Sequence, residues 1–459
     1  MEETFSDEFI ANEQTMHRKI LDNLEEWRLL KDRMPLIVKG ARQVGKTYLL
    51  KEWGRVAFDR VHYVNFEQSP AAAKMFEQDF DTNRIVEDLA FFLKTTIRPQ
   101  TDLVIFDEIQ AAPKALTALK YFCEDAPQLA VCAAGSLLGV ILSDESFPVG
   151  KVHFLHMHPL SFEEFLMAVD EREAWKKLPE PALDAKLSAT VHEHLWDMAK
   201  LYYAVGGMPA AVNAFVRYKS SPATVWKRVR DVQRSLITGY ENDFAKHAGK
   251  INAAHIQVLY RSIPSQLAEY HDDSTKRFKF GDVMSGRKGF AAWERPLHWL
   301  VHAGLVLQVK IANQALQPLE HFCRTNLFKL YVHDIGLLGC LQDLATEAIR
   351  GQDYGLAKGY FAENFVAQEL RACHAEREWP LYSWHEGEAQ IEFVRATAAG
   401  VVPIEVKAGH RTKAKSLAEF VRKYAPPLSI KISANNLSYD AATGRLNLPL
   451  YLASWASLL

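Results

Sequence analysis

The first third of the chain alternates short apolar runs with longer mixed segments. Five of these runs are short enough, and sharply enough bounded, to be buried strands. They cover residues 36–38, 61–66, 103–106, 129–134 and 152–155. Residues 48–53, soon after the first run, have the composition of a helix. This pattern predicts an α/β fold with a doubly wound parallel sheet and helices on both faces.

A glycine-rich loop joins the first predicted strand to that helix. Residues 40–47 read Gly-Ala-Arg-Gln-Val-Gly-Lys-Thr, and glycines let successive backbone N–H groups face a chain of phosphates. In such a P-loop, Lys46 is expected to reach the β- and γ-phosphates and Thr47 to offer its hydroxyl to Mg²⁺. The predicted nucleotide-binding residues are Gly40, Ala41, Arg42, Gln43, Val44, Gly45, Lys46, Thr47 and Tyr48. The loop therefore predicts that the chain binds ATP together with Mg²⁺; the alternative is a glycine turn with a solvated lysine.

Two adjacent carboxylates end the third predicted strand. Asp107 and Glu108 follow an apolar run about sixty residues after the loop, and open α/β sheets bind ligands at the carboxyl ends of their strands. Asp107 is expected to hold Mg²⁺ and Glu108 to polarise the attacking water. Ser136, after the next strand, is a candidate sensor of the γ-phosphate or an ordinary turn residue. With Lys46, these residues form the predicted catalytic set of an ATPase.

Length and composition restrict the remaining possibilities. A chain of 459 residues exceeds what one hydrophobic core normally supports, so two or three domains are expected. Its net charge of −2 gives no overall electrostatic argument for nucleic acid or an anionic membrane. The acidic N-terminus is unlike a signal peptide, and no apolar run is long enough to cross a bilayer. Five cysteines without a C-x-x-C spacing indicate neither a disulfide framework nor a zinc site. We therefore expect a cytoplasmic protein without a membrane segment.

Short motifs in the rest of the chain carry a resemblance to a known family. They are Gly135-Ser136, the sequence HPLSFEEF at 158–165, GGMP at 206–209, NDFAK at 242–246, DIGLL at 334–338 and ENFV at 363–366. With the P-loop, they make nearly the whole chain resemble bacterial and archaeal ATPases of the AAA superfamily whose P-loop domain precedes a characteristic C-terminal domain of unknown function. Relatives usually have Gly-Arg before the fifth strand, where this chain has Gly150-Lys151. Lysine lacks the planar fork of arginine, so no arginine finger is assigned.

The resemblance and the residue patterns together predict five parts. These are an N-terminal helical segment (1–30), an AAA-type P-loop ATPase core (31–190), a helical lid (191–250), a winged-helix-like region (251–325) and a restriction-endonuclease-like domain (326–459). Residues 158–165 also look like a helix start, with Ser161 as its cap and Glu164 at the third helical position. In the fourth part, basic and aromatic residues are interleaved: Lys276, Arg277, Lys279, Arg287 and Lys288 with Phe278, Phe280 and Trp293. That stretch could follow a phosphate backbone, or it could be a solvated face.

The last predicted part carries three acids and a lysine in a suggestive order. Glu363 lies in a helix-like segment, Glu392 in a strand, and Glu405 and Lys407 in the next strand. Carboxylates can hold Mg²⁺ and a lysine can orient water at a scissile phosphate. The arrangement resembles the restriction-endonuclease-like fold with its PD-(D/E)-x-K signature, although Glu392 stands where relatives have aspartate. The alternative is that Glu405 and Lys407 pair as surface charges on one strand face. A basic neighbourhood follows at Arg411, Lys413, Lys415, Arg422 and Lys423.

Three functional hypotheses remain open at this point. The leading one is a Mg²⁺-dependent ATPase that couples nucleotide state to engagement of a partner, with DNA as the candidate partner. The second is an ATP-regulated, metal-dependent DNA nuclease that uses the four residues of the last part. The third is a nucleotide-gated scaffold that binds another protein. A homo-oligomer is compatible with each of them.

Overall fold

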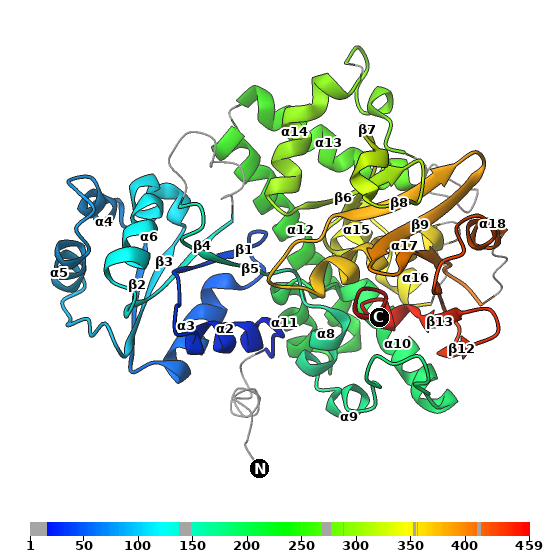
Figure 1. Ribbon diagram of the computed structural model, residues 1–459, viewed down its shortest axis with the longest axis horizontal. Helices are drawn as coiled ribbons and strands as arrows, with labels where there is room; N and C mark the ends of the chain where they lie inside the picture. Colours follow the sequence, from blue (N-terminus) through cyan, green and yellow to red (C-terminus); the bar gives the residue numbers. More distant parts are fainter. Residues whose placement is uncertain are drawn as a thin grey trace. The chain divides into compact units, whose positions relative to one another are not determined.

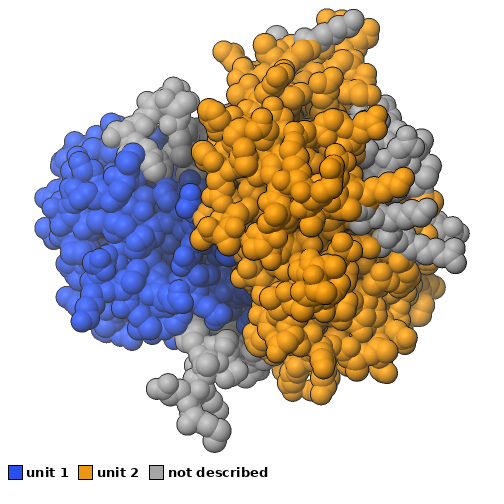
Figure 2. Space-filling model, turned by 45° about the vertical axis from the view of Figure 1, so that its right-hand side comes forward, with its two compact units in different colours: residues 1–158, 302–304, 374–378 blue, residues 159–301, 305–373, 379–459 orange. Residues whose placement is uncertain are grey.

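The computed structural model describes residues 16–136, 148–248, 250–268, 277–287, 289–351, 355, 357–410 and 415–459. By its internal contacts the chain divides into two compact units (Figure 2). Unit 1 consists of residues 1–158, 302–304 and 374–378, and unit 2 of residues 159–301, 305–373 and 379–459. The five-part organisation expected from the sequence stays a prediction.

Unit 1 is built on a five-stranded parallel sheet with the order β2-β3-β4-β1-β5 (Figure 1). The strands are β1 (Leu36–Lys39), β2 (Arg60–Asn65), β3 (Asp102–Asp107), β4 (Ala130–Gly135) and β5 (His153–His156). Every pairing within it is parallel. The parallel α/β sheet predicted from the apolar runs is thereby confirmed. Its carboxyl edge carries the ends of β1 and β3, where the P-loop and the two carboxylates begin.

Helices cover both faces of this sheet (Figure 1). They are α2 (Ile20–Leu29), α3 (Lys46–Ala57), α4 (Pro70–Ala73), η1 (Lys74–Phe76), α5 (Thr82–Phe92), η2 (Ile109–Ala111) and α6 (Pro113–Asp125). Val104 and Phe106 of β3 face the core formed with α5 and α6. The opposite face receives α3 so closely that a Cβ on Gly54 would lie 2.8 Å from side-chain atoms of Leu103 and of Val61. This packing fixes the helix that carries the phosphate loop.

Unit 2 begins with helices and continues into a second sheet. Its helices are α8 (Phe162–Ala168), α9 (Arg172–Trp175), α10 (Ala189–Val205), α11 (Pro209–Tyr218), α12 (Pro222–Ala248), α13 (Lys250–Ala268), η3 (Phe280–Asp282), α14 (Phe290–His302), η4 (Leu319–Phe322), α15 (Ile335–Leu341), α16 (Thr346–Arg350), α17 (Ala357–Ala372), α18 (Lys415–Tyr424), η5 (Leu450–Leu452) and α19 (Trp455–Leu458). The capping box predicted at Ser161 and Glu164 is present at the start of α8. Among the helices that the structure describes, none combines the length and apolar character needed to cross a membrane.

The sheet of unit 2 has eight strands in the order β12-β13-β11-β10-β9-β8-β6-β7. They are β6 (Val306–Ala312), β7 (Cys323–Val332), β8 (Leu381–Glu386), β9 (Ala389–Thr397), β10 (Gly400–Val406), β11 (Ser429–Ser433), β12 (Ser438–Asp440) and β13 (Arg445–Pro449). β8, β9 and β10 pair antiparallel, whereas β10 and β11 pair parallel across α18. β6 and β7 form an antiparallel hairpin that continues this large sheet through the parallel pairing of β6 with β8.

A buried carboxylate ties two glycine-rich segments of unit 2 together. Asp334 caps α15, accepting hydrogen bonds from the backbone N–H of Leu337 at 3.0 Å and of Gly207 at 2.7 Å. A Cβ on Gly206, whose φ is +77°, would lie 2.4 Å from a carboxylate oxygen of Asp334. Burial raises the pKa of Asp334 to about 6, although the backbone donors oppose the shift. The GGMP and DIGLL motifs are therefore the two sides of one packed junction.

Candidate functional site

The phosphate loop owes its shape to two glycines. Gly40 has φ of +151°, and a Cβ there would lie 2.1 Å from the carbonyl oxygen of Met157. Gly45, with φ of +104°, immediately precedes α3 in the left-handed region. Gly45 can adopt this conformation because it has no Cβ. The loop thus turns sharply into the N-terminus of a helix, where unpaired N–H groups favour an anion.

Lys46 is buried at the base of this loop. Its Nζ donates to the carbonyl oxygens of Gly40 at 2.9 Å and Ala41 at 2.8 Å. Burial lowers the pKa of Lys46 to about 8, and the nearby Glu108 and Asp107 carboxylates only partly oppose this shift. The ammonium therefore donates to carbonyl oxygens that phosphate oxygens could replace, beside the loop expected to bind phosphates.

Asp107 collects three side-chain donors on one oxygen. Its Oδ2 accepts hydrogen bonds from the Thr47 hydroxyl at 3.0 Å, the Tyr63 hydroxyl at 2.7 Å and the Asn65 amide at 3.3 Å. Asn65 stands directly opposite Asp107 in the pairing of β2 with β3. The structure thus brings the predicted Thr47 and Asp107 together. Tyr63 and Asn65 were not predicted as part of the site, although polar residues alternate at the carboxyl end of β2 and could have indicated them.

Glu108 is held in a conformation that non-glycine residues rarely adopt. Its backbone lies in the left-handed region, with φ of 49° and ψ of 47°, and such strain gathers at functional sites. Gln110 donates a hydrogen bond to its side chain. Burial is the largest cause that raises the pKa of Glu108, Asp107 adds to it, and Lys46 opposes it. A carboxyl with a raised pKa close to a phosphate site is suited to polarising water.

The remaining predicted residues of the nucleotide site occupy different positions around it. Ser136 is buried directly after β4, the strand that lies between β1 and β3. Tyr48 is half-exposed on the first turn of α3, and Gln43 is exposed in the loop. Lys151, which stands where the family resemblance predicts arginine, forms an ion pair with Glu124 at 3.0 Å with both side chains partly exposed.

Arg18 supports the phosphate loop from outside the motif. Its guanidinium donates to the carbonyl oxygen of Val44 at 3.0 Å and to that of His158 at 2.6 Å. The side chain is buried, so the loop and the segment after β5 are tied through it. Nothing in the local sequence around Arg18 indicated this role.

A second polar cluster lies in the eight-stranded sheet of unit 2. The structure brings together the four residues predicted there, and Glu363, Glu392 and Glu405 are all buried. Lys407 Nζ lies 3.6 Å from Glu392 and 3.8 Å from Glu405. The interpretation of Glu405 as a surface charge is therefore wrong, whereas Lys407, just after β10, is partly exposed and lies close to Glu405 as that interpretation expected. Burial, followed by the nearby Glu392 carboxylate, raises the pKa of Glu405 to about 7.

Two residues absent from the sequence prediction complete this cluster. Lys329, from β7, is buried with its Nζ 3.9 Å from Glu363. Tyr331 donates its hydroxyl to the same carboxylate at 2.6 Å. Among the described residues, no group of three or more His, Cys, Asp or Glu side chains is arranged to hold a metal ion.

The interleaved basic and aromatic stretch does not present its rings to solvent. Phe278, Phe280 and Trp293 are buried, so they serve the core of unit 2 and cannot stack on bases. Arg287 is engaged with the carbonyl of Ala292 and with His255. Lys276 and Lys288 lie outside the described residues, as do Arg411 and Lys413 of the later basic neighbourhood.

Within that later neighbourhood, α18 presents Lys415 and Arg422 to solvent. Lys423 pairs with Glu386, which removes one positive charge from any anion-binding surface there. The described residues of this neighbourhood therefore carry less net positive charge at the surface than the sequence alone predicts.

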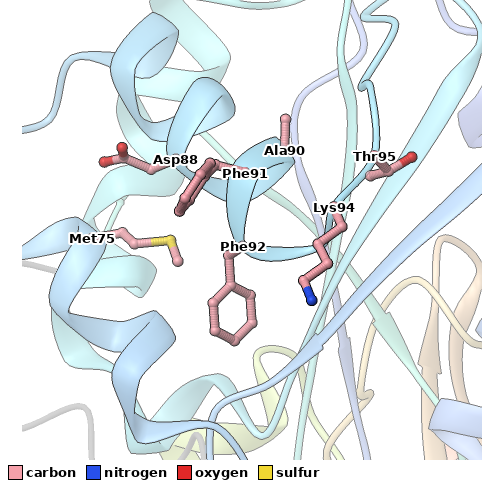
Figure 3. A pocket seen from close by; sticks show the side chains of 7 residues that line it. All are labelled: Met75, Asp88, Ala90, Phe91, Phe92, Lys94 and Thr95. Carbon is pink, nitrogen blue, oxygen red and sulfur yellow. The ribbon is translucent and has the colours of Figure 1, made fainter.

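Unit 1 also has an apolar depression of about 700 Å³ (Figure 3). It is lined by Met75, Asp88, Ala90, Phe91, Phe92, Lys94 and Thr95. Phe91, at the end of α5, is 89% exposed. None of the lining residues belongs to the nucleotide site, so this depression takes no part in the chemistry described above.

Family models match three separate stretches of the chain. Residues 32–166 match an AAA domain, residues 197–348 a domain of unknown function (DUF8612), and residues 358–451 another domain of unknown function (DUF4143). None of the curated proteins matches the chain. The AAA match over the five-stranded sheet and its loop supports a P-loop ATPase.

Two solved structures are similar at low identity. A Walker-type ATPase of Pyrococcus abyssi is 14% identical, with a TM-score of 0.45, and the match covers 72% of this chain and 97% of that one. PCH-2 of C. elegans is 12% identical, with a TM-score of 0.29, and the match covers 46% of this chain and 67% of that one.

Proposed function

We propose that the protein binds ATP with Mg²⁺ at the P-loop of unit 1, hydrolyses it, and uses the nucleotide state to change how unit 2 engages a partner. The observation that carries the first part is the convergence on Asp107. Its carboxylate lies 3.0 Å from the Thr47 hydroxyl, at the carboxyl edge of the sheet and beside the buried Lys46. A magnesium–phosphate complex needs these three groups close together.

The oxygen donors present fit Mg²⁺. Magnesium is usually bound in proteins by one or two carboxylates together with phosphate oxygens and water, and Asp107 with the Thr47 hydroxyl supplies donors of this kind. Mg²⁺ would neutralise charge that develops on the phosphate oxygens. Tyr63 and Asn65 hold the Asp107 carboxylate in place by donating to Oδ2. The nucleotide would thus meet an oriented carboxylate without first having to order it.

Lys46 and Glu108 have separate roles in the proposed hydrolysis. Lys46 would exchange the carbonyl oxygens of Gly40 and Ala41 for phosphate oxygens, which are stronger acceptors because they are charged. Glu108 would accept a hydrogen bond from the attacking water and take up its proton as the water oxygen bonds to the γ-phosphorus. The bond from that phosphorus to the β–γ bridging oxygen breaks in the same step, and ADP leaves with the bridging oxygen. The raised pKa of Glu108, caused chiefly by burial, makes it a better proton acceptor than an exposed glutamate.

DNA is the partner that we propose for unit 2, and a nuclease-like fold is the reason. The order α17-β8-β9-β10-α18-β11, antiparallel in its first pairings and parallel in the last, supports the proposal of a restriction-endonuclease-like arrangement. Glu363, Glu392, Glu405 and Lys407 lie together on it. DNA cleavage is the second candidate function, and it would require these four residues to hold a divalent metal.

The decisive experiment measures ATP turnover by the full chain with and without duplex DNA. Lys46→Ala should abolish nucleotide binding, whereas Glu108→Gln should retain binding and lose turnover. Lys120→Ala, an exposed lysine on α6, is the matched control and should behave as the unmodified protein. Turnover stimulated by DNA supports the whole proposal. ATP binding without turnover, unaffected by DNA, would refute hydrolysis and favour a nucleotide-gated scaffold that binds another protein.

A further inference from the structure

A nuclease-like fold implies a divalent metal at its acidic cluster, and the donors of this cluster do not fit one. Mg²⁺ requires near-octahedral oxygen coordination and usually keeps several water ligands. Glu363, Glu392 and Glu405 are 5%, 2% and 2% exposed, which leaves little access for such waters. The described residues also contain no His, Cys, Asp and Glu group arranged for a metal.

The oxygen atoms of Glu392 already have partners. Its Oε2 accepts a hydrogen bond from the backbone N–H of Val406 at 3.0 Å. Its Oε1 lies 3.6 Å from the Lys407 ammonium, and that ammonium is also 3.8 Å from Glu405 Oε1. A cation entering between Glu392 and Glu405 would have to displace Lys407, the lysine that the fold normally keeps for the reacting phosphate.

Glu363 is engaged from the other side by residues of β7. Its Oε2 accepts the hydroxyl proton of Tyr331 at 2.6 Å and lies 3.9 Å from the Lys329 ammonium. Lys329 is buried and comes from outside the α17-to-β11 segment that forms the nuclease-like core. The chain therefore supplies a second buried ammonium to the acidic cluster, close to where the first carboxylate of a metal site would bind its ion.

We propose that the Lys329 ammonium takes the place of the divalent metal, so that the cluster is a metal-independent ion-pair network joining α17 to the sheet. Two ammoniums, Lys329 and Lys407, then lie among three carboxylates from α17, β9 and β10 without any bound ion. A buried charge without a partner is strongly unfavourable, so the same lysine that excludes the metal keeps the fold intact. This inference concerns unit 2 and is independent of ATP hydrolysis.

Metal binding by nucleotide-free full-length protein tests the proposal. Mn²⁺ titration, with free Mn²⁺ followed by electron paramagnetic resonance, would be carried out in an Asp107→Asn background so that the nucleotide site does not contribute. With Lys329 intact, no Mn²⁺ should bind to the cluster. Lys329→Ala should gain one Mn²⁺ site, with an affinity at least tenfold higher than any residual Mn²⁺ binding by the protein that keeps Lys329. A further Glu392→Gln change should abolish this gain. Lys310→Ala on the neighbouring β6, which removes the surface partner of Glu320, is the matched control and should gain no site.

Two results would overturn the proposal. One is Mn²⁺ binding by the protein with Lys329 intact that disappears on Glu392→Gln. The other is a folded Lys329→Ala protein that gains no site. Should Lys329→Ala not fold, the thermal midpoint of the Asp107→Asn protein decides. An equal midpoint in EDTA and in Mn²⁺ supports the proposal, whereas a rise in Mn²⁺ that Glu392→Gln removes refutes it.

Discussion

Replacing Tyr63 with phenylalanine tests how the magnesium-binding carboxylate is positioned. The change removes one hydroxyl and keeps the ring, over which the Lys51 ammonium lies 3.2 Å from the centroid. Burial and the nearby Asp107 carboxylate raise the pKa of Tyr63 to about 12. The hydroxyl therefore stays protonated, and donates to Asp107, throughout the ordinary pH range.

The size of the effect follows from the donors that remain. A hydrogen bond to a charged acceptor contributes about 1.5–3 kcal/mol. Thr47 and Asn65 still donate to the same oxygen after the change, and Tyr63 is only partly buried, so water can enter in its place. We therefore expect a value just below this range, about 1.4 kcal/mol, which is a tenfold change in an equilibrium constant.

The assay is ATP turnover as a function of Mg²⁺ concentration at saturating ATP. Tyr63→Phe should need about tenfold more Mg²⁺ for half-maximal turnover, with a maximal rate close to that of the unmodified protein, because the hydroxyl positions Asp107 and does not touch the reacting atoms. Tyr121→Phe is the matched control, since that ring stacks on Phe80 of the same unit outside the nucleotide site.

An unchanged or lower Mg²⁺ requirement in Tyr63→Phe would refute this reasoning. It would mean that Tyr63 competes with the metal for Asp107 and leaves when the metal binds. The control variant makes the result interpretable, because a general loss of folded protein would lower the maximal rate without shifting the Mg²⁺ midpoint.

Three further predictions concern pH and stability. Because burial lowers the pKa of Lys46 to about 8 and phosphates favour its charged form, ATP affinity should fall as pH rises through 8; equal affinity on both sides of that pH, measured by equilibrium binding, would contradict this. The pKa of Asp334 is raised from 3.8 to about 6 in the folded protein, so its contribution to stability is fully present below pH 3.8 and is lost as pH rises through 6. The side chain in Asp334→Asn cannot ionise. As pH rises from 3.8 to 6, the free energy of unfolding of this variant should therefore improve, relative to that of the unmodified protein, by up to about 3 kcal/mol. A difference between the two proteins that does not change with pH would contradict this. Ser161→Ala removes the N-cap of α8, because the Ser161 hydroxyl accepts a hydrogen bond from the Glu164 N–H. The change should lower the free energy of unfolding by about 1 kcal/mol in denaturant titrations. An unchanged value would show that the cap is dispensable.

The parts of the fold that the sequence predicts are those encoded locally. Apolar runs end at the carboxyl edge of the sheet, and Gly40 and Gly45 adopt backbone angles that explain why glycine stands there. Thr47 and Asp107 could be paired because each belongs to a recognisable motif. In each case a few neighbouring residues carry the information.

What the sequence does not reveal depends on contacts between distant segments. Asn65 reaches Asp107 through the register of β2 with β3, and Arg18 reaches the carbonyl of His158 across 140 residues. The alternation of basic and aromatic residues also gave a wrong expectation of which side chains are exposed. The rings of Phe278 and Phe280 alternate with basic residues in the sequence, yet they point into the core, since alternation describes the faces of a segment without saying which face is buried.

Lys46 and Lys329 are both buried lysines, yet their surroundings predict different roles for them. Both are buried ammoniums close to carboxylates. Lys46 donates to carbonyl oxygens of a loop that turns into a helix N-terminus, so an incoming anion can take over its hydrogen bonds and gain backbone N–H groups as well. Lys329, on β7, lies 3.9 Å from Glu363 of α17, and Lys407 lies within 3.8 Å of both Glu392 and Glu405 nearby. Moving Lys329 would take the ammonium away from the buried Glu363 carboxylate and leave it the neutral Tyr331 hydroxyl, which costs more than the exchange at Lys46. The first lysine is therefore poised to bind a ligand, whereas the second is fixed in the fold.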